Sequence, residues 1–162
     1  MGAVRECQSP AQIRRTVRRL ARVGVSAIKT AVVSRTFDGK PVRGWSDAQL
    51  NALTDEAHRH GLMVCAHLTY AADYVQAARC GVDSVHHAAF DGVITDRVAD
   101  ELIEAGVVFV PTLSLASLLI DGMQYRWCDD PQFTAGLPPA LVRNMREFTT
   151  HYEQCPPDEP VP

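Results

Sequence analysis

The stretch GLMVCAHLTYAADYVQAARCGVDSVHH, residues 61–87, decides the fold. It contains two short apolar runs. Each run follows a glycine and ends in a histidine, His67 in the first run and His87 in the second. An alanine-rich segment with helical spacing lies between them. Glycine is typical just past a helix end, where it takes the left-handed conformation without a Cβ clash. The stretch therefore predicts a strand, a helix and a second strand.

The same helix–glycine–strand pattern recurs on both sides of this stretch, in VGVSAIKT around Gly24 and in AGVVFVPTL around Gly106. The preceding helices have start signals, such as Ser9 before a proline and the capping box of Ser46 with Gln49. Four helices that alternate with four uniformly apolar strands predict an α/β fold of right-handed βαβ units, with parallel strands covered on both faces. We expect an inward face that contains Ile28, Val64, Ala66, Val85 and Val108 or Phe109.

A polar residue stands near the end of each predicted strand. Lys29 lies five residues after its glycine, and His67, His87 and Thr112 each lie six residues after theirs. The carboxyl ends of parallel strands are where barrels and open α/β sheets build their active sites. We therefore expect His67 and His87 to converge, with Lys29 nearby.

Two histidines at equivalent strand ends favour a metal site, because histidine is the commonest metal ligand and zinc binds two or three of them. His86 competes with His87 for this role. Neighbours in a strand point to opposite faces, so only one should join His67, and the spacing favours His87. Three interpretations of Lys29 are open. It is a structural residue whose aliphatic part packs against the sheet and whose ammonium group reaches solvent at the edge, a Schiff-base nucleophile, or an amine that adds carbon dioxide and bridges two metal ions as a carbamate.

The composition narrows the class of protein. The chain has 162 residues, of which 46% are hydrophobic, and a net charge of −3, so we expect one domain-sized core and no nucleic-acid partner. No apolar stretch reaches the ~20 residues that span a membrane, and the start of the chain lacks a signal core. The five cysteines form no CxxC pair, which argues against a disulfide framework. These features predict a cytoplasmic protein without a membrane partner.

Four motifs, VGVSAIKT, LTDEAHRHGLMVCAHL, AARCGVDSVHHAAF and LIEAGVVFVPTL, resemble the amidohydrolase superfamily in order and spacing, in particular its imidazolonepropionase-like and Xaa-Pro dipeptidase-like branch. The resemblance implies a (β/α)8 TIM-like barrel with one or two divalent metal ions, zinc being the expected one. By position, Lys29 matches the carbamylated bridging lysine of strand 4, a catalytic and metal-binding role. His67 and His87 match the metal ligands of strands 5 and 6.

The chain departs from the family pattern in two ways that concern catalysis. It lacks the strand-1 His-x-His pair and the strand-8 aspartate that handles the proton of the attacking water. We therefore expect a partial barrel, strands 4 to 7, in residues 1–152, followed by a proline-rich acidic tail in residues 153–162. A complete barrel needs about 250 residues.

The resemblance implies a hydrolase of C–N bonds in amides, lactams or dipeptides, weak or inactive as this chain alone. Two alternatives stay open. One is a metal-binding or interaction module without catalysis, and the other is a lyase that uses Lys29.

The expected partners are a small-molecule substrate and either a second copy of the chain or a missing half of the barrel. Two long loops after predicted strands would contact the substrate. The second should contain a short helix over residues 115–120. The candidate substrate-binding residues are Arg35, Arg43, Tyr70, Tyr125 and Arg126.

Overall fold

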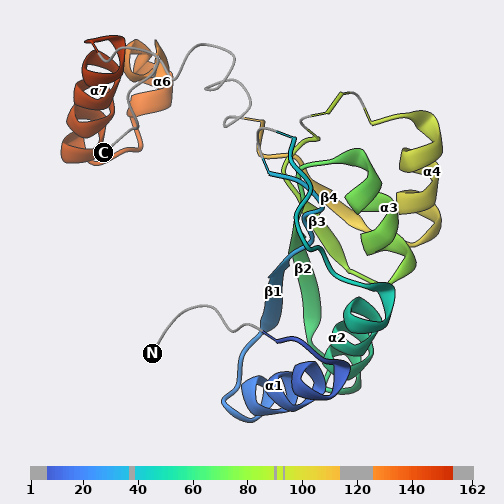
Figure 1. Cartoon of the computed structure of the whole chain (residues 1–162). Helices are drawn as coiled ribbons and strands as arrows, with labels where there is room; N and C mark the ends of the chain where they lie inside the picture. Colours follow the sequence, from blue (N-terminus) through green and yellow to red (C-terminus); the bar gives the residue numbers. More distant parts are fainter. Residues whose placement is uncertain (1–6, 37–38, 90, 93, 114–125, 155–162) are drawn as a thin grey trace. The chain divides into compact units, whose positions relative to one another are not determined.

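The computed structural model describes residues 7–36, 39–89, 91–92, 94–113 and 126–154 (Figure 1). The chain divides into two compact units, Met1–Thr112 and Leu113–Pro162. The first unit contains the alternating helices and strands that the sequence predicts. The described residues of the second unit form helices only.

The helices of the first unit begin and end where their sequence signals lie. They are α1 (Pro10–Arg22), α2 (Asp47–Arg59), α3 (Ala71–Arg79) and α4 (Asp96–Glu104). Both α1 and α2 begin with a complete capping box, in which a serine side chain and a glutamine side chain satisfy each other's backbone N–H groups. Glycines with positive φ follow all four helices, at Gly24, Gly61, Gly81 and Gly106.

The four strands form one parallel sheet in chain order. They are β1 (Ala27–Ala31), β2 (Met63–His67), β3 (Ser84–His86) and β4 (Val108–Val110). Each strand pairs with the next one along the chain. The predicted α/β fold of parallel βα units is confirmed, and its order is that of part of a TIM-like barrel.

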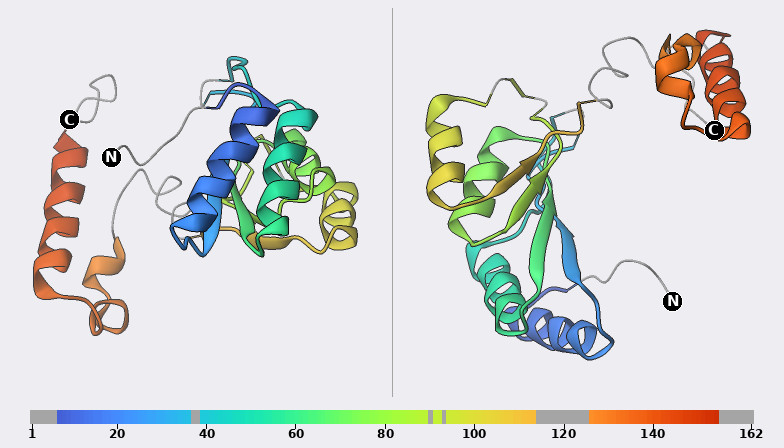
Figure 2. Two further views of the ribbon diagram at one scale, coloured as in Figure 1. Left: turned by 90° about the horizontal axis from the view of Figure 1, so that it is seen from below. Right: turned by 180° about the vertical axis from the view of Figure 1, so that it is seen from behind.

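The core lies between the sheet and its helices. Figures 1 and 2 show α2, α3 and α4 on one side of the sheet, with α1 packed against α2. Alternate strand residues point into this layer and are fully buried or nearly so: Ile28, Val64, Ala66 and Val85. Tyr74 of α3 is fully buried in the same layer. These strand residues face helices, so the prediction that they line the inner face of a barrel is wrong.

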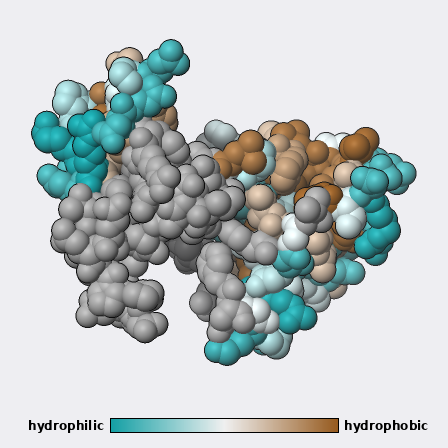
Figure 3. Space-filling model, turned by 90° about the horizontal axis from the view of Figure 1, so that it is seen from above, coloured by the Kyte–Doolittle hydropathy of each residue, from teal (hydrophilic) through white to brown (hydrophobic). Residues whose placement is uncertain are grey.

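The opposite face of the sheet is bare in the described part of the first unit. It contains Lys29, Cys65, His67 and His86, because residues two apart in a strand share a face. Met63 and Val108, on the same face, are 49% and 56% exposed. Seen from above, hydrophobic residues gather along one side of this unit (Figure 3). The expectation that the strands are covered on both faces is therefore wrong for the described residues.

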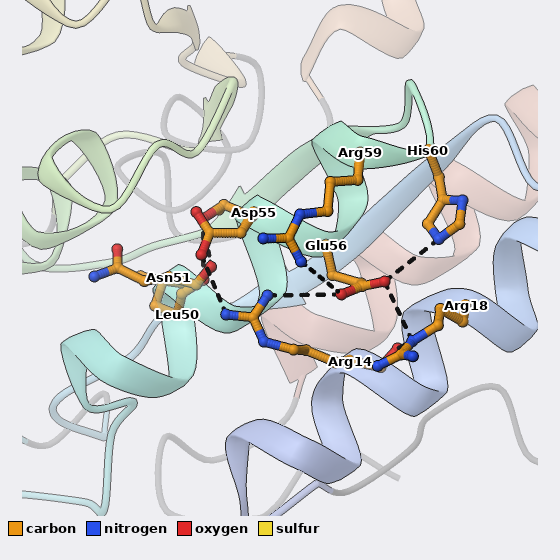
Figure 4. A network of polar contacts seen from close by, with 9 residues as sticks. Arg14, Arg18, Leu50, Asn51, Asp55, Glu56, Arg59 and His60 are labelled. Atoms are coloured by element: carbon orange, nitrogen blue, oxygen red, sulfur yellow. Dashed lines mark hydrogen bonds and ion pairs between the residues drawn. The ribbon is translucent and has the colours of Figure 1, made fainter.

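A cluster of ion pairs joins α1 to α2 (Figure 4). The Glu56 carboxylate, whose side chain is only 6% exposed, lies 3.2 Å from Arg18 Nε and 3.6 Å from Arg14 Nη1. Arg59 and His60 approach the same carboxylate within 3.5 Å and 3.4 Å. A nearly buried carboxylate needs such partners, so part of the arginine-rich face of α1 serves to hold α2.

The second unit contains a 3-10 helix η1 (Arg126–Asp129), a short helix α6 (Pro131–Thr134) and a longer helix α7 (Pro139–Gln154). Arg146 of α7 donates to the carbonyl of Cys128 at 2.8 Å and pairs with Asp129. The sequence pattern did not predict α7. The helix predicted over residues 115–120 and most of the predicted tail lie outside the described residues. Among the helices that the structure describes, none is long and apolar enough to cross a membrane.

Candidate metal centre

His67 and His87 lie side by side at the carboxyl edge of the sheet. His67 is the last residue of β2, and His87 directly follows β3. Their ring centroids are 4.5 Å apart and the rings meet edge to face. The predicted convergence of the two imidazoles is therefore observed. Their role as metal ligands stays a prediction.

The backbone of His87 takes an unusual conformation, with φ at +78°. Positive φ is uncommon for any residue other than glycine. Contacts on both sides hold it: its N–H donates to the Val110 carbonyl at 2.9 Å, and its carbonyl accepts from the Tyr74 hydroxyl at 2.7 Å. Thr112, also at positive φ, places its Oγ1 3.0 Å from His87 Nδ1. Strained residues held in this way are typical of functional sites.

His86 belongs to the same cluster, contrary to the sequence-based expectation. It pairs in register with His67, so the two side chains share a face. Its Nδ1 lies 2.9 Å from Lys29 Nζ, and its Nε2 lies 3.0 Å from Ser84 Oγ. Strict alternation would have placed His87 on the opposite face. The left-handed turn at His87 ends the alternation and returns its ring to His67.

Lys29 lies in the middle of β1 and not at its end. Its register partner is Cys65, two residues before His67. The spacing from Gly24 predicted a strand-end position, which is wrong because β1 continues to Ala31. Lys29 nevertheless reaches the cluster, since its long side chain contacts the ring of His86.

The cluster brings four basic groups, Lys29 and three histidines, together in a partly desolvated place. Burial lowers the pKa of Lys29, and the charge of Cys65 opposes that effect. Burial also lowers the pKa of His67, and the charges of His87, Lys29 and His86 lower it further. The pKa values of His86 and His87 are lowered by burial and then by Lys29. These shifts favour neutral imidazoles, the form that binds a metal.

The ring nitrogens of His67 and His87 fit part of a metal site. His87 Nδ1 bonds to Thr112, which leaves Nε2 for a ligand, and such outer contacts commonly orient metal-binding histidines. The ring nitrogens of His67 have no hydrogen-bond partner within the described residues, and its backbone carbonyl accepts from the Val32 N–H at 2.9 Å. Among those residues, however, no three His, Cys, Asp or Glu side chains are arranged to hold an ion. Zinc usually takes at least three protein ligands, so the described residues alone do not make up a complete zinc site.

The candidate substrate-binding residues make other contacts, are exposed, or lie outside the described residues. Tyr70 donates its hydroxyl to the Thr36 carbonyl at 2.7 Å, and Arg35 donates to the Gly39 carbonyl at 3.0 Å. Both bonds stabilise the loop after β1. Arg43 is exposed. Tyr125 and the side chain of Arg126 lie outside the described residues, so all five roles stay predictions.

Sequence reasoning missed two residues that support the cluster, Tyr74 and Ser84. Tyr74 holds the His87 backbone, and Ser84 holds the His86 ring. A tyrosine inside an alanine-rich helix was a signal that could have been followed, because a buried phenol usually needs a partner. Ser84 could have been found from its place two residues before His86, on the same face of the strand.

Together, the parallel βα order and the histidine–lysine cluster at the carboxyl edge define a class: α/β barrel-type proteins with a polar site at the strand ends. No family model and no curated protein matches the chain. Solved structures do match it. One is an amidohydrolase with 28% identity and a TM-score of 0.59, and the match covers 90% of this chain and 33% of that one.

Two further matches show the same fold at lower identity. The Aspergillus niger (A. niger) ochratoxinase has 20% identity and a TM-score of 0.63, with coverage of 90% of this chain and 31% of that one. A Xaa-Pro dipeptidase with methionine bound in its active site has 20% identity and a TM-score of 0.59, with coverage of 90% and 34%. The chain therefore has the fold of part of an amidohydrolase-superfamily barrel, as its motifs predicted. It spans about a third of the length of these structures.

Proposed function

We propose that this chain carries one side of the active site of a metal-dependent hydrolase that acts on C–N bonds. The observation that carries the proposal is the convergence of His67 and His87 at the strand ends, with Lys29 in the same cluster. The match to an amidohydrolase at 28% identity supports the general class. The particular substrate, an amide, a lactam or a dipeptide, depends on loops whose contacts differ between such enzymes.

In this proposal the two histidines hold a divalent metal ion, expected to be zinc. Lys29, as a carbamate, would contribute an anionic oxygen to the ligand set. A bound ion would supply a water of lowered pKa and polarise the scissile carbonyl. The cluster's own contribution would be to favour neutral imidazoles, to hold the two rings 4.5 Å apart, and to leave His87 Nε2 available because Nδ1 bonds to Thr112.

The hydrolase needs more than this chain's described residues provide. The bare face of the sheet and the outer edges of β1 and β4 need a cover, because exposed strand edges and apolar faces promote association. We propose that further βα units of the barrel type cover them and complete the ligand set. Without them, we expect weak or no turnover, because the residue that takes the proton of the attacking water would be missing. General acid–base catalysis alone typically raises the reaction rate by about 10²–10⁴-fold.

A lyase that uses Lys29 is a second candidate, and one observation favours it. Burial lowers the pKa of the Lys29 amine, which raises the fraction of the nucleophilic neutral form. Borohydride reduction in the presence of a carbonyl substrate would trap a covalent adduct on Lys29. The hydrolase proposal predicts no such adduct and a dependence on metal instead.

Metal analysis of the purified chain tests the proposal. We expect His67→Ala and His87→Ala to reduce bound zinc strongly, and His58→Ala to leave it unchanged. His58 is a suitable control because it lies before β2 and pairs with Asp83 at 2.9 Å. Equal zinc loss from His58→Ala and His67→Ala would contradict the assignment. Hydrolysis of dipeptides or lactams at rates typical of complete enzymes would contradict the expected weakness of the isolated chain.

A further inference from the structure

His86 has no role in the ligand assignment, yet it connects two strands that do not pair. Lys29 lies on β1 and His86 on β3, with β2 between them. Strands two apart are separated by about 10 Å, so only a long side chain can cover this distance. The residue of β2 in register with Lys29 is Cys65, whose small side chain leaves room for the lysine to cross. Lys29 Nζ lies 2.9 Å from His86 Nδ1, so the lysine side chain spans the width of β2 to reach β3.

The hydrogen-bonding chemistry orients the His86 ring. An ammonium group only donates hydrogen bonds, so Nδ1 must accept from a charged Lys29. Nε2 then carries the ring hydrogen and donates it to Ser84 Oγ, 3.0 Å away. Ser84 is only 5% exposed, so the ring is held from its buried end.

Both ring nitrogens of His86 are thus engaged. This distinguishes the His86 ring from the neighbouring rings: within the described residues the His67 ring has no hydrogen-bond partner, and the His87 ring uses Nδ1 alone. A histidine with two engaged nitrogens has none left for an ion. His86 is therefore suited to hold another residue of the cluster.

We propose that His86, held by Ser84, is a positioning residue that fixes the Lys29 amine beside the His67–His87 pair. This inference rests on the proposed function, in which Lys29 acts at that pair. A free lysine side chain loses much rotamer freedom when it is fixed in one place. To add carbon dioxide, the Lys29 ammonium first releases one proton to solvent, and the neutral amine then forms an N–C bond with carbon dioxide and releases a second proton. The carbamate nitrogen keeps one hydrogen, which can donate to Nδ1 as the amine did.

Two substitutions of matched shape separate positioning from simple packing. His86→Asn and His86→Leu introduce side chains with the same branching, and only asparagine offers an acceptor near the position of Nδ1. Lysine occurs only at positions 29 and 40 of the sequence, so lysine labelled with ¹³C and ¹⁵N gives two sets of side-chain signals. Lys29→Arg assigns them, and Lys40 serves as the internal control.

The first measurement is the NMR spectrum of the lysine ε-methylene groups in the full chain. We expect two distinct proton shifts for Lys29 in the parent and in His86→Asn, and one averaged shift in His86→Leu. The Lys40 signals should not change. Unaltered Lys29 signals in His86→Leu would overturn the proposal. Loss of the distinct shifts in both variants would also overturn it, since the acceptor would then be irrelevant.

The second measurement is calorimetric titration of the same three proteins with zinc. We expect zinc affinity to fall by about 10–100-fold in His86→Leu, the range typical for outer contacts of metal sites, and to stay near the parent value in His86→Asn. Equal weakening in both variants would contradict positioning. Absence of zinc binding in all three, with the NMR difference intact, would refute the proposed metal function and still support positioning of Lys29.

Discussion

Removal of the Tyr74 hydroxyl tests whether the buried layer holds His87 in its left-handed conformation. In Tyr74→Phe, the His87 carbonyl loses the partner that now donates to it at 2.7 Å. Burial and nearby carboxylates raise the pKa of Tyr74 to about 12, so the phenol is a neutral donor at ordinary pH. Tyr74 is fully buried and the bond is partly buried, so its loss should lower the free energy of unfolding by about 1–2 kcal/mol.

Tyr70→Phe is the matched control for this substitution. The Tyr70 hydroxyl also donates to a backbone carbonyl at 2.7 Å, but that bond is exposed, so water can replace it. We expect a cost within about 0.5 kcal/mol, the usual range for surface changes. Urea unfolding followed by circular dichroism gives both values. For a chain of this size, each kcal/mol corresponds to about 2–4 °C in melting temperature.

The two variants should also differ in zinc affinity. A freed His87 carbonyl permits the backbone to relax from φ +78°, which moves the ring away from His67. We therefore expect Tyr74→Phe to weaken zinc binding and Tyr70→Phe to leave it unchanged. Equal losses of stability in the two variants, or unchanged zinc affinity in Tyr74→Phe, would refute the account of how His87 is held.

Three other predictions follow from the cluster, the ion pairs and the bare sheet. The pKa values of the three clustered histidines are lowered in the folded chain, so the unfolded chain binds their protons first as the pH falls below 6.5. The free energy of unfolding should therefore decrease as the pH falls. Urea titrations at several pH values should show a weaker pH dependence in His67→Asn. Glu56→Gln should lower the free energy of unfolding by about 1–3 kcal/mol in the same assay, because the nearly buried Glu56 carboxylate then no longer pairs with Arg14 and Arg18, whereas Arg14 keeps Asp55; a cost near zero would contradict this. Sedimentation should show self-association through the bare face, and a monodisperse monomer with a sharp melt would show that no cover is needed.

Sequence patterns predicted the order and type of the elements in the first unit because the signals there are local. Capping boxes, the glycines after each helix and the apolar runs act over a few residues, and each predicts its own helix or strand. The convergence of His67 and His87 followed from one further rule, that parallel strands end at one edge. These rules depend on chain spacing alone, so they do not require knowledge of the packing.

The errors concern features that packing determines. Side chains alternate between the two faces of a strand, so the sequence shows which residues share a face. In uniformly apolar strands it does not show which face packs against the helices, and Val64 and Val85 were therefore assigned to the wrong face. The positive φ of His87 depends on Tyr74 and Val110, which are distant in sequence, so the inclusion of His86 could not be foreseen. The position of Lys29 within β1 was missed because a glycine offset does not show where a strand ends.

The histidine ring nitrogens can be followed by NMR as zinc is added to the full chain, which shows directly whether His67 and His87 form a metal centre. The sequence has six histidines, so their signals can be assigned by substitution. We expect zinc to shift the ring nitrogens of His67 and His87 most, with coordination of His87 through Nε2 because Nδ1 bonds to Thr112. Zinc-induced shifts confined to other histidines, or no ring response at saturating zinc, would contradict a metal centre at this edge of the sheet.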